Sequence, residues 1–244
     1  MSRRQKRRFD VSQLRITPGA LFLLFVQLGL SMVWLLSSVT VRATMEEWLV
    51  ASSHSVWSEG KVWTLVTSPF LENTLVGLII SSLMLWGFVP TLERWWGRKR
   101  FLIYFAATSL AGTVIGTLVG LLTERSVGIS GYGPFVTSSM IAFGILYARQ
   151  PVQLWGVVPM TGKQMMIGIS AFVALFILLG RQWEIGGALA AAMGTGALIA
   201  SGRWNPRLWW YKWRHRRVRR KLEVLDGGRA RTPRRSGTDE SMLN

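Results

Sequence analysis

Few side chains in this sequence could carry out covalent chemistry. Residues 128–131 read Gly-Ile-Ser-Gly, a Gly-x-Ser-Gly pattern in which Ser130 is a candidate nucleophile. A serine hydroxyl reacts only when a neighbouring base takes its proton. The chain has no cysteine and two histidines, His54 and His215, so thiolate chemistry, disulfides and cysteine-ligated metals are excluded. We expect no metal site and no cofactor.

A base for Ser130 is hard to find. Both histidines lie outside the apolar stretches of the chain, His54 in a polar loop and His215 in a basic tail. The remaining candidate is Glu184, and a carboxylate is a weak base unless burial raises its pKa. Ser130 could instead cap the helix that follows it. Likewise, Glu184 and Glu72 could be functional groups near the ends of spans or carboxylates bathed in interfacial water.

The elements that must position these side chains are apolar. Half of the 244 residues are hydrophobic, and 29 basic against 12 acidic residues give a net charge of +17, which does not suit a soluble cytosolic domain. A membrane-spanning helix needs about 20 apolar residues. We therefore predict an all-α membrane protein with a six-transmembrane-helix domain over residues 16–202. Its expected spans are 16–41, 73–92, 101–123, 126–148, 164–180 and 185–202.

The distribution of lysine and arginine predicts the orientation. The basic N-terminus (1–15) and the loops 90–100 and 149–163 carry more Lys and Arg than the intervening loops, and such excess marks the cytoplasmic side. We expect both termini to be cytoplasmic and the membrane to be a bacterial inner membrane. Tryptophans cluster where spans meet loops, as interfacial anchors do.

Beyond the last span the chain becomes strongly basic. Residues 203–225 place Trp and Leu beside dense Arg, which predicts an amphipathic juxtamembrane helix on anionic lipid headgroups. Nucleic-acid binding by the same residues is the alternative that we do not expect. Residues 226–244 are expected to be a disordered cytoplasmic tail.

Small residues recur every fourth position in two expected spans. They allow close helix contact, so the third and sixth spans should pack inside the bundle. The residues are Gly112, Gly116 and Gly120 in one span and Gly186, Ala190 and Gly194 in the other.

Three stretches together resemble the rhomboid family of intramembrane serine proteases, over roughly residues 15–202. Residues 62–105 are similar to the second rhomboid span and the entry to the third, including the pair Leu92-Glu93. Residues 150–167 are similar to the loop into the fifth span, and GGALAAAMG (186–194) to the small-residue helix of the sixth.

The resemblance implies a serine–histidine dyad and oxyanion donors that this chain lacks. The position of the family's serine is occupied by Gly133 and that of its histidine by Glu184. The positions matching two histidines and an asparagine hold Glu72, Gly77 and Ser81. All five positions depart from the family pattern, whereas the packing residues between them are retained.

These departures favour a non-enzyme over an enzyme. We expect a catalytically inactive rhomboid-like pseudoprotease that binds or adapts membrane-protein clients through their transmembrane segments. Client-binding candidates are Glu72, Glu184, Trp86 and Phe172, around the gap between the second and fifth spans. The alternative is a rhomboid serine endopeptidase that uses an atypical site around Ser130.

Overall fold

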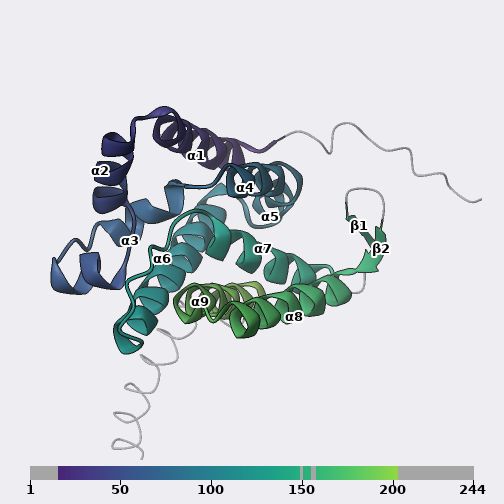
Figure 1. The fold of residues 1–244 in the computed structure, drawn as a ribbon. Coiled ribbons are helices and arrows are strands. Elements are labelled where there is room, and N and C mark those ends of the chain that lie inside the picture. The colour runs from purple at the N-terminus through teal and green to yellow at the C-terminus, as the bar shows by residue number, and fades with distance from the viewer. Residues whose placement is uncertain (1–15, 149–150, 155–157, 203–244) are drawn as a thin grey trace, which may run out of the picture. The chain divides into compact units, whose positions relative to one another are not determined.

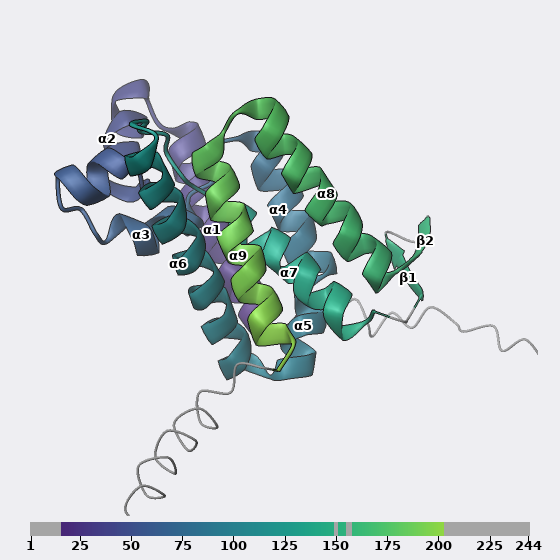
Figure 2. The same ribbon diagram turned by 90° about the horizontal axis from the view of Figure 1, so that it is seen from below.

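The computed structural model describes residues 16–148, 151–154 and 158–202, and Figures 1 and 2 show them from two sides. Nearly all of the ordered elements in these ranges are helices. The exception is an antiparallel hairpin of β1 (Pro151–Leu154) and β2 (Val158–Thr161). The helices are α1 (Pro18–Leu36), α2 (Val39–Leu49), η2 (His54–Ser58), α3 (Thr64–Thr67), η3 (Ser68–Phe70), α4 (Leu75–Gly87), α5 (Val89–Trp96), α6 (Arg98–Leu122), α7 (Gly133–Leu146), α8 (Gly162–Gly180) and α9 (Trp183–Ala200).

Five segments of the described chain are long and apolar enough to cross a membrane, one fewer than predicted. Joined α4 and α5 count as one of them. The break between these two helices falls at Phe88, and Pro90, in the first turn of α5, has no amide hydrogen to continue the hydrogen bonds of α4. The five segments are Pro18–Leu36, Leu75–Trp96, Arg98–Leu122, Gly162–Gly180 and Trp183–Ala200.

The fourth expected span, 126–148, is only partly helical. α7 has 14 residues, about 21 Å at 1.5 Å per residue, against a hydrocarbon core of about 30 Å. The Pro134 side chain lies 2.8 Å from the Cβ position of Gly112, in the middle of α6. After α6 ends, the chain therefore runs back alongside it without helical structure, and α7 begins beside the middle of α6.

Protein groups satisfy the backbone of this non-helical segment, residues 123–132. The amide of Ile129 donates to the carbonyl of Ala51 (2.7 Å), and that of Gly131 donates to the carbonyl of Ser68 (3.0 Å). Irregular backbone at membrane depth is tolerated only when buried in protein or facing water. The backbone of residues 51 and 68 thus fixes this segment by hydrogen bonds, although both residues were predicted to lie in the loop between the first and second spans.

The first expected span, 16–41, is also shorter than predicted. α1 ends at Leu36, and α2 begins at Val39 as a separate helix with no buried residues. The Ser37 hydroxyl donates to the carbonyl of Val33 (2.5 Å). Serine side chains that bond to the backbone in this way compete with the helical ladder, so the paired serines 37–38 mark the end of the span.

α6 and α9 form the central packed pair of the bundle (Figure 2). A Cβ at Gly116 would lie 2.8 Å from the Cβ of Ala188, so the α6 glycines allow the close contact that their spacing predicted. On α9 the pattern is less uniform. Gly186 faces Ile177 of α8, and nothing lies within 4 Å of a Cβ at Gly194. α7 packs against both α8 and α9.

Candidate functional site

The position matched to the family's serine lies at the first turn of α7. Gly133 is exposed, and a Cβ built there would have one neighbour within 4 Å beyond the adjacent residues, Cδ2 of Leu189 at 3.9 Å. There is room for a side chain at Gly133. The neighbour that a Cβ there would meet, Leu189, is apolar and could not act as a base.

Glu184 lies in the first turn of α9 and is 1% exposed. Its Oε1 accepts a hydrogen bond from the Thr123 hydroxyl (3.1 Å) at the end of α6. Its Oε2 is buried and has no hydrogen-bond partner. The structure therefore does not bring Glu184 and Gly133 together, and Glu184 is not the water-bathed carboxylate that its place near a span end allowed.

Ser130 lies in the extended segment that leads to α7. The N-cap of α7 is Tyr132, with no capping bond from a side chain, so the prediction that Ser130 caps this helix is wrong. The Ile129 side chain contacts Gly116, beside the carbonyl of Glu184. No hydrogen bond joins Ser130 to Glu184 among the described residues, since Oε1 of Glu184 accepts from Thr123 and Oε2 has no partner.

Glu72 precedes α4 and is held by three segments of the chain. Its amide donates to the Ser31 hydroxyl of α1 (2.9 Å), and its Oε1 accepts from the Thr74 hydroxyl (3.1 Å). The carboxylate lies against two glycines, Gly77 and Gly131, and fills the space that a Cβ at either would need. Partial burial raises the pKa of Glu72 above its ordinary value.

The three positions matched to the family's oxyanion donors do not form one cluster. Glu72 and Gly77 are in contact, and Glu72 reaches Gly131, two residues before Gly133. Ser81 is buried deeper on α4, where its hydroxyl accepts from Nε2 of Gln27 on α1 (2.7 Å). The structure thus brings Glu72 to the start of α7 and leaves Ser81 in the contact with α1.

The apolar client-binding candidates lie on the outside of the bundle. Trp86 on α4 is 57% exposed and Phe172 on α8 is 67% exposed. Both are therefore open to lipid or to another transmembrane segment, and neither fills the core.

One buried carboxylate was not predicted as a site. Glu93 on α5 is 4% exposed and lies at the N-terminus of α1. Its oxygens accept hydrogen bonds from the amides of Gly19 (2.9 Å) and Ala20 (2.8 Å) and from the Thr17 hydroxyl (2.5 Å). These are donors that the start of a helix leaves unpaired. Little in the sequence signals this role, because Glu93 directly precedes Arg94 in the basic stretch 90–100.

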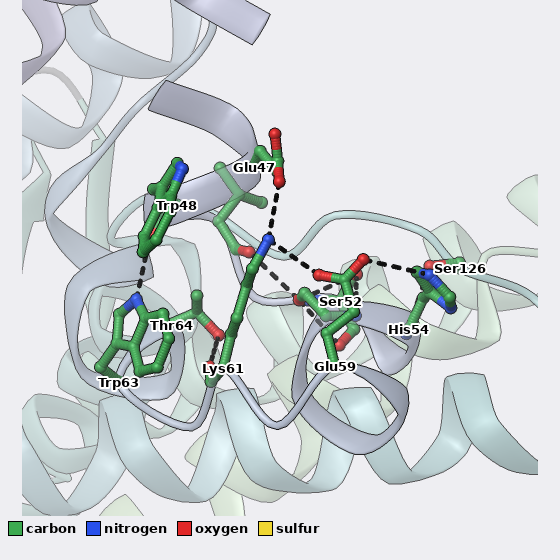
Figure 3. A network of polar contacts seen from close by, with 11 residues as sticks. Glu47, Trp48, Ser52, His54, Glu59, Lys61, Trp63, Thr64 and Ser126 are labelled. Carbon is green, nitrogen blue, oxygen red and sulfur yellow. Dashed lines mark hydrogen bonds and ion pairs between the residues drawn. The ribbon is translucent and has the colours of Figure 1, made fainter. Parts of the chain in front are cut away.

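A polar network organises the loop that holds His54 (Figure 3). Nζ of Lys61 lies 2.8 Å from both Glu47 and Glu59, and Nε2 of His54 lies 3.3 Å from Glu59. Hydrogen bonds to these glutamates raise the pKa of Lys61, and the Lys61 ammonium lowers that of Glu59. His54 is thus tied to the surface of this loop, on a different element from Ser130.

In the ranges that the structure describes, no three His, Cys, Asp or Glu side chains lie close enough together to hold a metal ion. The basic tail, 203–225, and its expected lipid contact lie outside those ranges.

Comparison with known proteins identifies the family. Residues 21–200 match the model of the family described as eukaryotic integral membrane protein (DUF1751). The chain belongs to this family. DUF1751 membership makes the chain an integral membrane protein, as its spans predicted, and the label "eukaryotic" gives no support to the bacterial inner membrane that we expected.

This DUF1751 chain is also distantly similar to two proteins of Bacillus subtilis strain 168. It is 26% identical over 119 residues to the one named "Putative rhomboid protease YdcA", which covers 48% of this chain and 58% of that protein. It is 31% identical over 94 residues to "Rhomboid protease GluP", which covers 37% of this chain and 18% of that protein. The chain thus spans less than two thirds of either relative. The similarity supports distant kinship with rhomboid proteases.

Proposed function

We propose that this protein is a non-proteolytic relative of the rhomboid proteases that binds transmembrane segments of client membrane proteins. The observation that carries the proposal is the environment of Gly133. At the position matched to the nucleophile there is no side chain, and beyond the adjacent residues and the backbone of α7 the one atom within 4 Å of the Cβ position is the apolar Cδ2 of Leu189. The glutamate that replaces the family's histidine is turned to Thr123 instead.

The client would bind on the side of the bundle where α4 and α8 expose aromatic side chains. In the family that this chain resembles, the gap between the corresponding spans is the lateral entrance. Trp86 and Phe172 would contact the apolar part of the client, because aromatic surfaces bury large areas. Glu72, half-buried near the start of α7, would meet a polar or basic group. Glu184 is buried and closed off from direct contact with a client in this conformation.

Crosslinking in cells tests client binding. A photo-crosslinking residue at Phe172 should capture discrete membrane proteins, and one at Phe22 on α1, which is exposed to a similar extent, should capture mainly lipid. Glu72→Ala should reduce capture at Phe172, whereas Glu72→Gln should retain part of it. Equal capture at both positions, or capture unchanged by Glu72→Ala, would reject the proposed binding surface.

Labelling with a serine-directed fluorophosphonate tests the absence of proteolysis. The purified protein should not react, and Ser130→Ala should behave as the parent does. Labelling that disappears in Ser130→Ala would replace our proposal with an atypical serine protease.

We also propose that both termini face the cytoplasm. The chain has no native cysteine, so single cysteines report on topology. Ser58→Cys, in the exposed part of the loop after α2, should react with an impermeant maleimide added outside cells. Lys163→Cys should react only after the membrane is opened. The reverse result would invert the orientation.

A further inference from the structure

A buried carboxylate oxygen without a partner lies at the C-terminal end of α6. Glu184 is 1% exposed, and the Thr123 hydroxyl donates to its Oε1 (3.1 Å). Its Oε2 is also buried and accepts no hydrogen bond. Buried polar atoms are nearly always bonded to protein, water or an ion. Oε2 therefore points to a ligand that is not part of the described chain.

No cation of the described ranges neutralises this carboxylate. The ion pairs found in those ranges surround Lys61 and Glu59 in the loop after α2. Arg125 follows Thr123 by two residues, but its Nη1 donates to the carbonyl of Arg181 (3.4 Å). Burying a carboxylate without a countercharge is costly, so a positively charged ligand suits this place better than a neutral one.

Further oxygen atoms lie beside Gly120, in the last turn of α6. A Cβ at Gly120 would lie 3.0 Å from the carbonyl oxygen of Arg125, 3.2 Å from Cβ of Ser53 and 3.3 Å from Cγ of Glu184. The Ser53 hydroxyl donates to the Arg125 carbonyl (2.6 Å), and a carbonyl oxygen has a second lone pair. The helix ends at Leu122, so the negative end of its dipole lies here as well.

The type and charge of these groups select the ligand. Carboxylate and carbonyl oxygens bind hard cations. A divalent ion usually takes several carboxylates, and no group of three His, Cys, Asp or Glu side chains lies together in the part of the chain that the structure describes. In membrane proteins, helix C-terminal ends and unwound backbone carbonyls coordinate sodium, and both features meet here. The single charge of Glu184 matches a monovalent ion.

We propose that Glu184 Oε2, the Arg125 carbonyl oxygen and the Ser53 hydroxyl oxygen bind a sodium ion at the C-terminal end of α6. Thr123 is a positioning residue, because its hydrogen bond to Oε1 orients the carboxylate. The ion would join the start of α9, the loop after α2 and the non-helical segment 123–132. The site is separate from the surface proposed for clients and does not depend on client binding.

Thermal unfolding of the full-length protein in detergent tests the site. Sodium chloride is compared with choline chloride at equal ionic strength, because choline is too large for a buried site. A ligand that binds only the folded protein raises the unfolding temperature as its concentration rises. At a few times its dissociation constant, sodium should raise the unfolding temperature by about 2 °C. Radioactive sodium should bind saturably to the purified protein.

Substitutions at the end of α6 and the start of α9 locate the ion. Glu184→Gln keeps the size of the side chain and removes its charge, so it should abolish the sodium response and leave unfolding in choline chloride nearly unchanged. Thr123→Val should weaken sodium affinity about tenfold, whereas Thr123→Ser should retain it. The matched control is Glu124→Gln, which removes an exposed carboxylate next to Thr123 and should keep the full response.

Three results would contradict the sodium site. Equal unfolding temperatures of the parent in sodium and choline chloride would overturn it. A response that Glu184→Gln retains, or that Glu124→Gln loses, would reject Glu184 as the ligand. If Glu184→Gln does not fold, binding of radioactive sodium to the two Thr123 variants decides the question, and equal affinity of Thr123→Val and Thr123→Ser would reject the site.

Discussion

Two glutamates are buried at the first turns of helices in this protein, and their surroundings differ. Glu93 caps α1 with three donors on its two oxygens. Glu184 lies in the first turn of α9 with one donor, Thr123, on one oxygen, and its other oxygen is buried without a partner. Burial is nearly the same for both, at 4% and 1% exposure.

The number of hydrogen-bond donors around a buried carboxylate indicates whether it stabilises the fold. A fully bonded group such as Glu93 fixes the structure, because removing it strands several donors. A group such as Glu184 adds little stability, since the cost of burying an ion exceeds what one hydrogen bond returns. Glu184 lies at the position matched by sequence to the histidine of the rhomboid proteases, and the Thr123 hydroxyl is its one hydrogen-bond partner in the described structure.

The largest expected effect follows from Glu93→Gln. The amide would present hydrogen atoms where two backbone amides and the Thr17 hydroxyl need acceptors. We expect a loss of about 3 kcal/mol, the scale for hydrogen bonds to a buried charge. Thermal unfolding in detergent measures it, and a loss below about 1 kcal/mol would show that α1 needs no cap from α5.

Gly131 tests the contact with a third, half-buried glutamate. Gly131 and Gly97 have almost the same positive φ, 78° and 77°, but only Gly131 has the Glu72 carboxylate in the space of a Cβ. Gly97→Ala should cost about 2 kcal/mol for backbone strain alone, because its φ of 77° and ψ of 157° lie in a region that only glycine adopts readily. Gly131→Ala should cost more than Gly97→Ala, and Glu72→Ala should remove part of that difference. Equal losses for the two glycine variants would mean that Glu72 moves aside freely.

Glu184→Gln completes the comparison with Glu93. The Thr123 hydroxyl keeps an acceptor and the side chain keeps its size, so the free energy of unfolding should shift by less than about 1 kcal/mol in either direction. The measurement is the same as for Glu93→Gln. A loss as large as that of Glu93→Gln would show that Glu184 has partners essential to the fold.

The smallest effect concerns the exposed ion pairs of the loop after α2. Glu59 has a lowered pKa, so its stabilising contribution is present above its ordinary value of 4.5 and is lost as pH falls through the lower value. Lys61 has a raised pKa, so its contribution is complete below 10.5 and is lost at more alkaline pH. The hydrogen-exchange protection factors of residues 47–64, which correct for the intrinsic pH dependence of exchange, should be insensitive to these groups from about pH 5 to 10, and Lys61→Met should lower them throughout. A change inside that range would point to another titrating group.

Much of the fold could be predicted from hydropathy and small-residue spacing. α6, α8 and α9 lie where apolar runs indicated, because local composition determines whether a segment can span a membrane. The start of α7 could not be predicted in this way, since the carbonyls that satisfy residues 123–132 belong to Ala51 and Ser68, far away in the sequence. The helix break at Ser37 was similarly hidden in a continuous apolar run.

The sequence could indicate which positions belong to the candidate site, but it could not indicate which side chains contact one another there. The substitutions at Gly133 and Glu184 are visible by comparison with the family pattern. That Glu184 turns to Thr123, and that Glu72 rests on Gly131, depends on how three distant segments meet. The role of Glu93 likewise depends on contacts between distant parts of the sequence, because its carboxylate accepts hydrogen bonds from residues 17–20.

The short length of α7 has a consequence for biosynthesis. A 14-residue helix preceded by non-helical backbone is a poor substrate for insertion on its own, because the bilayer offers no partners for the amides of that backbone. The carbonyls of Ala51 and Ser68 that bond to it precede it in the chain, whereas α8 and α9, which pack against α7, follow it. We therefore expect stable insertion of α7 to depend on α8 and α9 as well as on its own apolar side chains.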